Sequence, residues 1–154
     1  MILSRTLAFA LLYCYRAFGC PNGWMTHDSS CYHFSHDTEE WASAVAICKI
    51  LGGHLVEIDD ATENLYLVSQ AKLLNKSFWI GLNDLQEENS WVWVNSNTPA
   101  SYTHWHPGQP DNGASNENCA HLYPGFSFSW NDKQCYTHYN YICEKAAEGS
   151  EIVG

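Results

Sequence analysis

Five polar side chains in the second half of the chain carry oxygen atoms suited to binding a hard cation. They are Gln109, Asp111, Glu117, Asn131 and Asp132. Three carboxylates and two amides suit Ca²⁺, which takes about 6–8 oxygen ligands in loose geometry, whereas Zn²⁺ favours His or Cys. Calcium held by these side chains keeps open positions that two adjacent sugar hydroxyls can fill. The same five residues are therefore predicted to bind both calcium and sugar.

The local sequence around these residues predicts how they converge. A cis bond between Gln109 and Pro110 would turn the chain sharply enough to bring Gln109 and Asp111 toward one ion. Asn131 and Asp132 are adjacent and would face opposite ways in a regular strand, so we expect a strand end or a distortion there. Each segment has an alternative reading, as a plain turn or as a strand that ends in a polar turn.

The elements that position these residues are predicted from periodicity and turn signals. A first helix should begin at Asp37 or Thr38, with Glu39 and Glu40 in its first turn, and end at Gly52-Gly53. Asp60 and Glu63 should open a second helix with three inward residues, Leu65, Val68 and Ala71. Strands are expected at 30–35, 55–58, 78–82, 91–94, around Trp130 and at 139–144. With the long polar loop 95–118, the pattern indicates an α+β domain.

The two ends of the chain differ from this domain. Arg5, the apolar stretch Leu7 to Tyr15 and the cleavage signal Ala17-Phe18-Gly19 predict a secretory signal peptide over 1–19. The domain is expected over 20–145 and a short acidic tail over 146–154. No other apolar run approaches the length that a bilayer requires. Cleavage would remove one of seven cysteines, and the remaining even number suits a secreted disulfide framework whose pairing the residues leave open.

Charge and motif content exclude other functions. With 7 Lys+Arg against 17 Asp+Glu, a formal net charge of −10 offers no basic face for nucleic acid. The chain has no nucleophile elbow, no paired His and Cys arrangement and no zinc signature, so we expect no enzyme activity. Asn75-Lys76-Ser77 is a candidate glycosylation site at Asn75.

These features together resemble a C-type lectin-like domain over residues 20–143. The resemblance rests on Trp79-Ile80-Gly81-Leu82, Gln109-Pro110-Asp111, Glu117, Trp130-Asn131-Asp132 and the cysteine spacing. It implies a fold of two helices on short antiparallel sheets with a long calcium-binding loop. It also implies three disulfides, Cys20–Cys31, Cys48–Cys143 and Cys119–Cys135.

The resemblance also implies the kind of ligand. Gln-Pro-Asp resembles the galactose-type pattern, in which an aromatic ring after the motif stacks on the sugar. Residues 112–116 contain no ring, so another aromatic residue would have to supply it: Trp105, His106, Tyr123 or Phe126. Some relatives have an auxiliary calcium site, and the matching positions here are Asp84, Glu88, Asn112 and Asn118. A solvated acidic loop is the alternative reading of those residues.

The sequence therefore predicts a secreted, extracellular, calcium-dependent lectin for terminal galactose-type glycans. We expect these glycans on microbial or host surfaces, with a role in innate immunity and with oligomers formed through surface contacts for avidity. The alternative is an extracellular matrix or shell protein that binds calcium carbonate mineral through the same fold.

Overall fold

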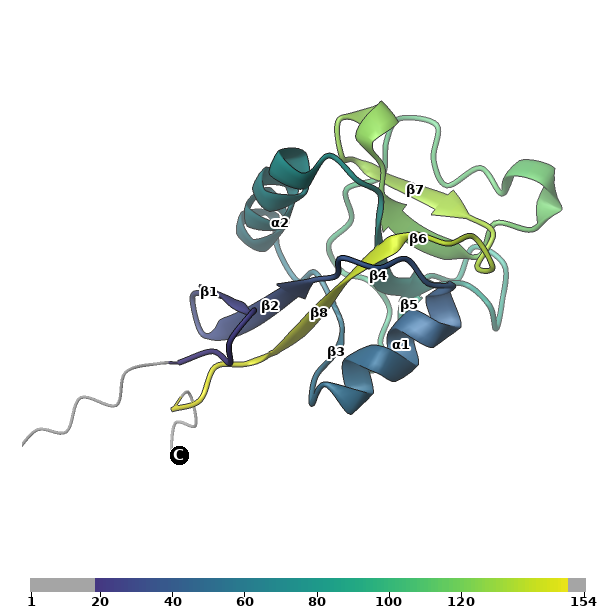
Figure 1. The fold of residues 1–154 in the computed structure, drawn as a ribbon. Helices are drawn as coiled ribbons and strands as arrows, with labels where there is room; N and C mark the ends of the chain where they lie inside the picture. The colour runs from purple at the N-terminus through teal and green to yellow at the C-terminus, as the bar shows by residue number, and fades with distance from the viewer. Residues whose placement is uncertain (1–18, 150–154) are drawn as a thin grey trace, which may run out of the picture.

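The computed structural model describes residues 19–149, which form an α+β domain as predicted (Figure 1). Apart from Gly19, the predicted signal peptide lies outside the described residues, as does the predicted tail from residue 150 onward. Within the described part of the chain, no helix is long and apolar enough to cross a membrane. The elements in chain order are β1 (Met25–His27), β2 (Ser30–Phe34), α1 (Trp41–Ile50), β3 (His54–Leu55), α2 (Ala61–Leu74), β4 (Phe78–Asn83), β5 (Val92–Trp93), η1 (Gly113–Ser115), β6 (Cys119–Leu122), η2 (Pro124–Phe126), β7 (Trp130–Lys133) and β8 (Asn140–Ala146).

The strands form one sheet in the order β1-β2-β8-β4-β6-β7, with β3 added to β8 and β5 added to β4. β8 runs antiparallel to β2 and parallel to the start of β4, so it joins the part of the sheet near the chain ends to the part that carries β6 and β7. Gly19 pairs with Glu148, which brings the two ends of the described chain together. These ends lie on the side of the domain away from β6 and β7 (Figure 1).

Helix α1 begins at Trp41, so the predicted start at Asp37 or Thr38 is wrong. Its N-cap residue is Glu40, whose side chain makes no capping hydrogen bond. The segment before it is extended because Glu39 and Tyr139 exchange backbone hydrogen bonds of 2.9 and 3.1 Å. This pairing with a distant segment keeps Glu39 and Glu40 out of the first turn.

Helix α2 has the predicted N-terminus but a different inward face. Asp60 accepts a hydrogen bond from the Glu63 backbone N–H at 2.9 Å, as a capping residue should. Val68 and Ala71 are buried as expected, together with Leu67, whereas Leu65 is 69% exposed and the prediction for it is wrong. The inward face instead includes Asn64, which lies one position earlier and is only 2% exposed.

The predicted strands lie within one or two residues of those observed, with three differences. The expected strand 55–58 is reduced to the short β3, and the sequence patterns missed both β1 and β6. β8 continues to Ala146, and Ala147 is buried, so the ordered chain extends past the predicted domain boundary.

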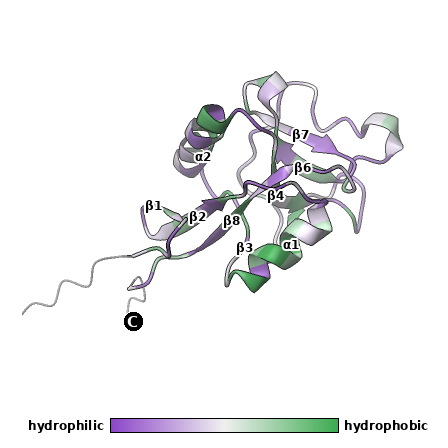
Figure 2. Ribbon diagram, in the orientation of Figure 1, coloured by the Kyte–Doolittle hydropathy of each residue, from purple (hydrophilic) through white to green (hydrophobic). Residues whose placement is uncertain are grey.

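Buried aromatic side chains and three disulfides hold the domain together. Trp79 and Trp130 are fully buried, and the Trp41 indole N–H donates to the Ile80 carbonyl at 2.9 Å. A Cβ atom on Gly81 would lie 2.8 Å from the Leu55 carbonyl oxygen, so the close approach of β4 requires glycine. The disulfides are those that the resemblance implies: Cys20–Cys31, Cys48–Cys143 and Cys119–Cys135. Figure 2 shows hydrophobic residues along α1 and hydrophilic residues on β7, where the candidate site lies.

Candidate functional site

A pocket of about 340 Å³ lies where β6 and β7 meet the long polar loop. Four of the five predicted ligands line it: Gln109, Asp111, Glu117 and Asn131. The other lining residues are Gly113, His121, Tyr123, Phe126, Lys133 and Tyr139. Asp132, the fifth predicted ligand, is fully buried in β7 beside the pocket. The structure therefore brings all five residues into one region.

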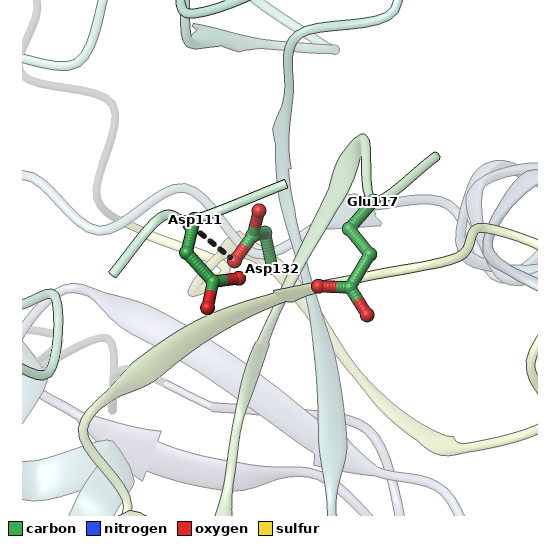
Figure 3. A group of neighbouring side chains, drawn as sticks. All are labelled: Asp111, Glu117 and Asp132. Carbon is green, nitrogen blue, oxygen red and sulfur yellow. Dashed lines mark hydrogen bonds between the residues drawn. The ribbon is translucent and has the colours of Figure 1, made fainter. Parts of the chain in front are cut away.

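The three predicted carboxylates form a tight cluster. Each of Asp111, Glu117 and Asp132 offers an oxygen atom, and these atoms lie within 4.8 Å of one another. Figure 3 shows the three carboxyl groups near one another, with Asp111 hydrogen-bonded to Asp132. Glu117 and Asp132 are buried and Asp111 is exposed. Burying like charges this close is unfavourable unless a cation neutralises them.

Hydrogen bonds fix the loop against β7 in this arrangement. The Asp132 carboxylate accepts from the backbone N–H groups of Asp111 at 3.2 Å and Asn112 at 2.7 Å. The Gly113 N–H lies 3.1 Å from an Asp111 oxygen and 3.0 Å from a Glu117 oxygen. The Gln109–Pro110 peptide bond is cis, as predicted. The backbone of the loop therefore positions the carboxylates.

The two amide residues have oxygen atoms available to a cation. Gln109 Oε1 is buried and has no hydrogen-bond partner among the described residues. The Asn131 side-chain nitrogen lies 2.7 Å from the Asp132 carbonyl oxygen and 3.0 Å from His121 Nε2. Because the amide donates both of its hydrogens there, the Asn131 oxygen is left for a ligand. This all-oxygen donor set fits Ca²⁺.

His121 is neutral and orients Asn131. It is 1% exposed, and burial, with a smaller contribution from the charge of Lys133, lowers its pKa to about 3. Nε2 therefore accepts from Asn131, while Nδ1 is buried without a partner among the described residues. His121 stacks on Tyr139, with ring centroids 4.7 Å apart. No motif in the sequence pointed to His121, although its register partner on β7 is Asn131.

Lys133 is a second residue of the pocket that the sequence analysis missed. Its Nζ lies 3.3 Å from Glu117 Oε1. Its position immediately after Asp132 was the available signal, because the strand that carries two predicted ligands continues through it.

Two of the four candidate aromatic residues line the pocket. Tyr123 immediately precedes η2, Phe126 is its last residue, and the two rings make an edge contact with centroids 4.9 Å apart. His106 stacks on Phe126 with ring centroids 4.0 Å apart and is not among the residues that line the pocket. Trp105 is half-buried, packs against Trp91 and Trp130, and is not among the pocket residues.

The four residues predicted to form an auxiliary calcium site, Asp84, Glu88, Asn112 and Asn118, are only partly brought together by the structure. The Asp84 backbone N–H donates to the Asn118 carbonyl at 3.1 Å, and Asn112 Oδ1 accepts from the Glu117 N–H. Asp84 is 2% exposed; its Oδ2 accepts from the Asn89 N–H, and its Oδ1 is buried without a partner among the described residues. Burial raises the pKa of Asp84, and nearby Asp132 adds to the rise. Within residues 19–149, Asp84 and Glu88 do not join the carboxylate cluster.

A two-helix α+β fold with three disulfides and a carboxylate-lined loop pocket is the architecture of a C-type lectin domain. The family model "Lectin C-type domain" matches residues 37–145, and the chain belongs to this family of non-enzymatic carbohydrate-binding proteins, whose domains generally bind calcium.

Similar proteins come from molluscs and vertebrates. The chain is 39% identical over 137 residues to a perlucin-like protein of Mytilus galloprovincialis, covering 84% of this chain and 85% of the relative. It is 37% identical over 130 residues to perlucin of Haliotis laevigata, covering 82% and 83%. It is also 37% identical over 123 residues to a hepatic lectin of Gallus gallus, covering 79% of this chain and 58% of that protein. Among solved structures, the mouse scavenger receptor C-type lectin carbohydrate-recognition domain superposes with a TM-score of 0.79 at 36% identity, covering 84% and 98%.

Proposed function

We propose that the protein is a secreted lectin that binds galactose-type glycans through one calcium ion. The ion would be held by Gln109, Asp111, Glu117, Asn131 and Asp132, which would also hydrogen-bond the sugar hydroxyls. The observation that carries the proposal is the convergence of three carboxylate oxygens within 4.8 Å on one pocket. An unpartnered buried oxygen of Gln109 supports it, since a buried polar atom needs a partner.

The galactose assignment has support from two features. Gln109 and Asp111 stand in the order of the galactose-type pattern, with the amide before the acid. Tyr123 and Phe126 line the same pocket and could stack on the apolar face of the sugar, which the ringless loop 112–116 cannot do. Asp84, Glu88, Asn112 and Asn118 are proposed as a weaker auxiliary calcium site, supported by the unpartnered Asp84 Oδ1.

The biological setting is part of the proposal. A secreted domain with a single shallow sugar site gains useful affinity from several copies, so we propose oligomers that form through surface contacts and bind microbial or host glycans in innate immunity. The side chain of Asn75, the candidate glycosylation residue, is exposed where it caps the end of α2.

A second candidate function is binding to calcium carbonate mineral in an extracellular matrix. The relatives named perlucin and perlucin-like protein favour it, as does the net charge of −10. Mineral binding by acidic surface residues would not need the pocket, and galactose would not displace the protein from mineral.

Two retention assays separate the two functions: one on immobilised galactose, in millimolar calcium and in chelator, and one on calcium carbonate, with and without free galactose. The proposed lectin binds galactose only with calcium, and Asp132→Asn abolishes that binding because the site loses a charge. Asp28→Asn, a change of the same kind at an exposed residue outside the pocket, is the matched control and should bind normally. Normal calcium-dependent binding by Asp132→Asn would contradict the assigned site, and retention on carbonate that galactose cannot compete would favour the mineral function.

A further inference from the structure

Lys133 places an ammonium group in the wall of the proposed sugar pocket. It is the last residue of β7, and of the described residues that line the pocket it is the only lysine or arginine. Its side chain is 35% exposed, whereas that of its partner Glu117 is 9% exposed. The Lys133 side chain is thus partly open to solvent, while the carboxylate that holds it is buried.

The Glu117 carboxylate has two competing uses. It is a member of the carboxylate cluster and also the ion-pair partner of Lys133, at 3.3 Å. A divalent cation at the cluster would draw the Glu117 charge toward itself and weaken the ion pair. Lys133 has a flexible four-carbon stem, so its ammonium can then turn toward the open part of the pocket.

The charges of the pocket also balance in a particular way. Three carboxylates and one ammonium carry two net negative charges, which a single Ca²⁺ cancels. An anionic group on the sugar would therefore meet no excess negative charge in the calcium-loaded pocket, and it would find an ammonium that has lost its partner.

We propose that Lys133 makes this site selective for acidic saccharides, namely galactose-type sugars that carry a carboxylate or a sulfate. The inference rests on the proposed calcium-dependent lectin function and narrows its ligand class. Carboxylates and sulfates both accept hydrogen bonds from an ammonium. The preference should weaken as salt is raised, since an ion pair at a partly exposed side chain is screened.

Competition for immobilised galactose tests the proposal with the full chain in millimolar calcium. The competitors are galactose, galacturonic acid and galactose 6-sulfate, so a carboxylate and a sulfate are tested separately. The wild-type protein should release from the support at roughly twofold to fivefold lower concentrations of an acidic competitor than of galactose, the effect of one partly exposed ion pair. Lys133→Met should bring this ratio to about one, and Lys133→Arg should keep it.

Lys72→Met removes a lysine from the exposed surface of α2 and is the matched control, with an unchanged ratio expected. Equal inhibition of the wild type by acidic and neutral sugars would overturn the proposal, as would an acidic preference that persists in Lys133→Met. Thermal unfolding of each variant shows whether it is folded, and Lys133→Gln provides a second neutral variant if Lys133→Met is not. A wild-type protein that never binds galactose in calcium would instead refute the lectin function, and the inference with it.

Discussion

Replacing His121 with Phe should separate calcium binding from folding stability. His121 accepts a hydrogen bond of 3.0 Å from Asn131, and its other ring nitrogen is buried without a partner among the described residues. The substitution leaves an Asn131 hydrogen unsatisfied, which costs about 1–3 kcal/mol, but it also removes an unsatisfied buried N–H of similar cost. The phenyl ring keeps the stack on Tyr139 and the edge contact with Trp79. We therefore expect the free energy of unfolding to change by less than about 1.5 kcal/mol.

Calcium affinity should respond differently in this variant. Without the acceptor at His121, the Asn131 amide is held only by the Asp132 carbonyl, and its oxygen is no longer fixed toward the ion. Loss of a residue that orients a metal ligand weakens metal binding by roughly tenfold or more. Titration calorimetry gives the calcium affinity, and urea unfolding in chelator gives the stability.

His121→Gln is the complementary variant. Its side-chain oxygen can still accept from Asn131, but it lacks the ring that packs against Tyr139 and Trp79. We expect calcium affinity close to that of the wild type and a stability loss of about 2–4 kcal/mol from lost packing. Equal calcium affinity in the wild type and His121→Phe would refute the orienting role, as would the same loss of affinity in both variants.

Three further predictions concern charge and packing. Lys133→Met should tighten calcium binding about twofold to fivefold, because it removes the ammonium that competes for Glu117, and calorimetry showing unchanged or weaker binding would contradict this competition. Burial raises the pKa of Glu144 from its usual 4.5 to about 7, so the folded state binds this proton more tightly than the unfolded state. Stability measured by urea unfolding in chelator should therefore fall by about 1–3 kcal/mol between pH 4.5 and pH 7, and Glu144→Gln should abolish that part of the slope; an identical slope in the variant would reject the assignment. Gly81→Ala should lower stability by about 2 kcal/mol or more in thermal unfolding, because its methyl group would meet the Leu55 carbonyl at 2.8 Å, and wild-type stability would show that β4 can move away.

The fold class and the five candidate ligands could be predicted from the sequence, because both predictions depend on residue types and short motifs. Its errors arose where distant segments decide local structure. Because Glu39 pairs with Tyr139, α1 begins at Trp41 and not at residue 37 or 38. The residues around position 37 alone do not predict a contact with a segment about 100 residues away. Asn64 can be buried because its side-chain oxygen accepts from the Trp130 indole N–H at 2.9 Å. Apolar periodicity cannot predict a buried polar residue, so it placed the neighbouring Leu65 on the inward face of α2. His121 and Lys133 were missed for the same reason, since their partners Asn131 and Glu117 come from other parts of the chain.

The pairing of Gly19 with Glu148 determines how the domain can be presented. Both ends of the described chain lie near β1 and β2, at one edge of the sheet, whereas β6 and β7 are at the other edge (Figure 1). Residues of β6 and β7 line the pocket. A linker or fusion partner attached at either end would therefore leave the pocket uncovered. Copies attached in this way to a common support would all face outward, and the increase in apparent affinity would depend on their spacing and on linker length.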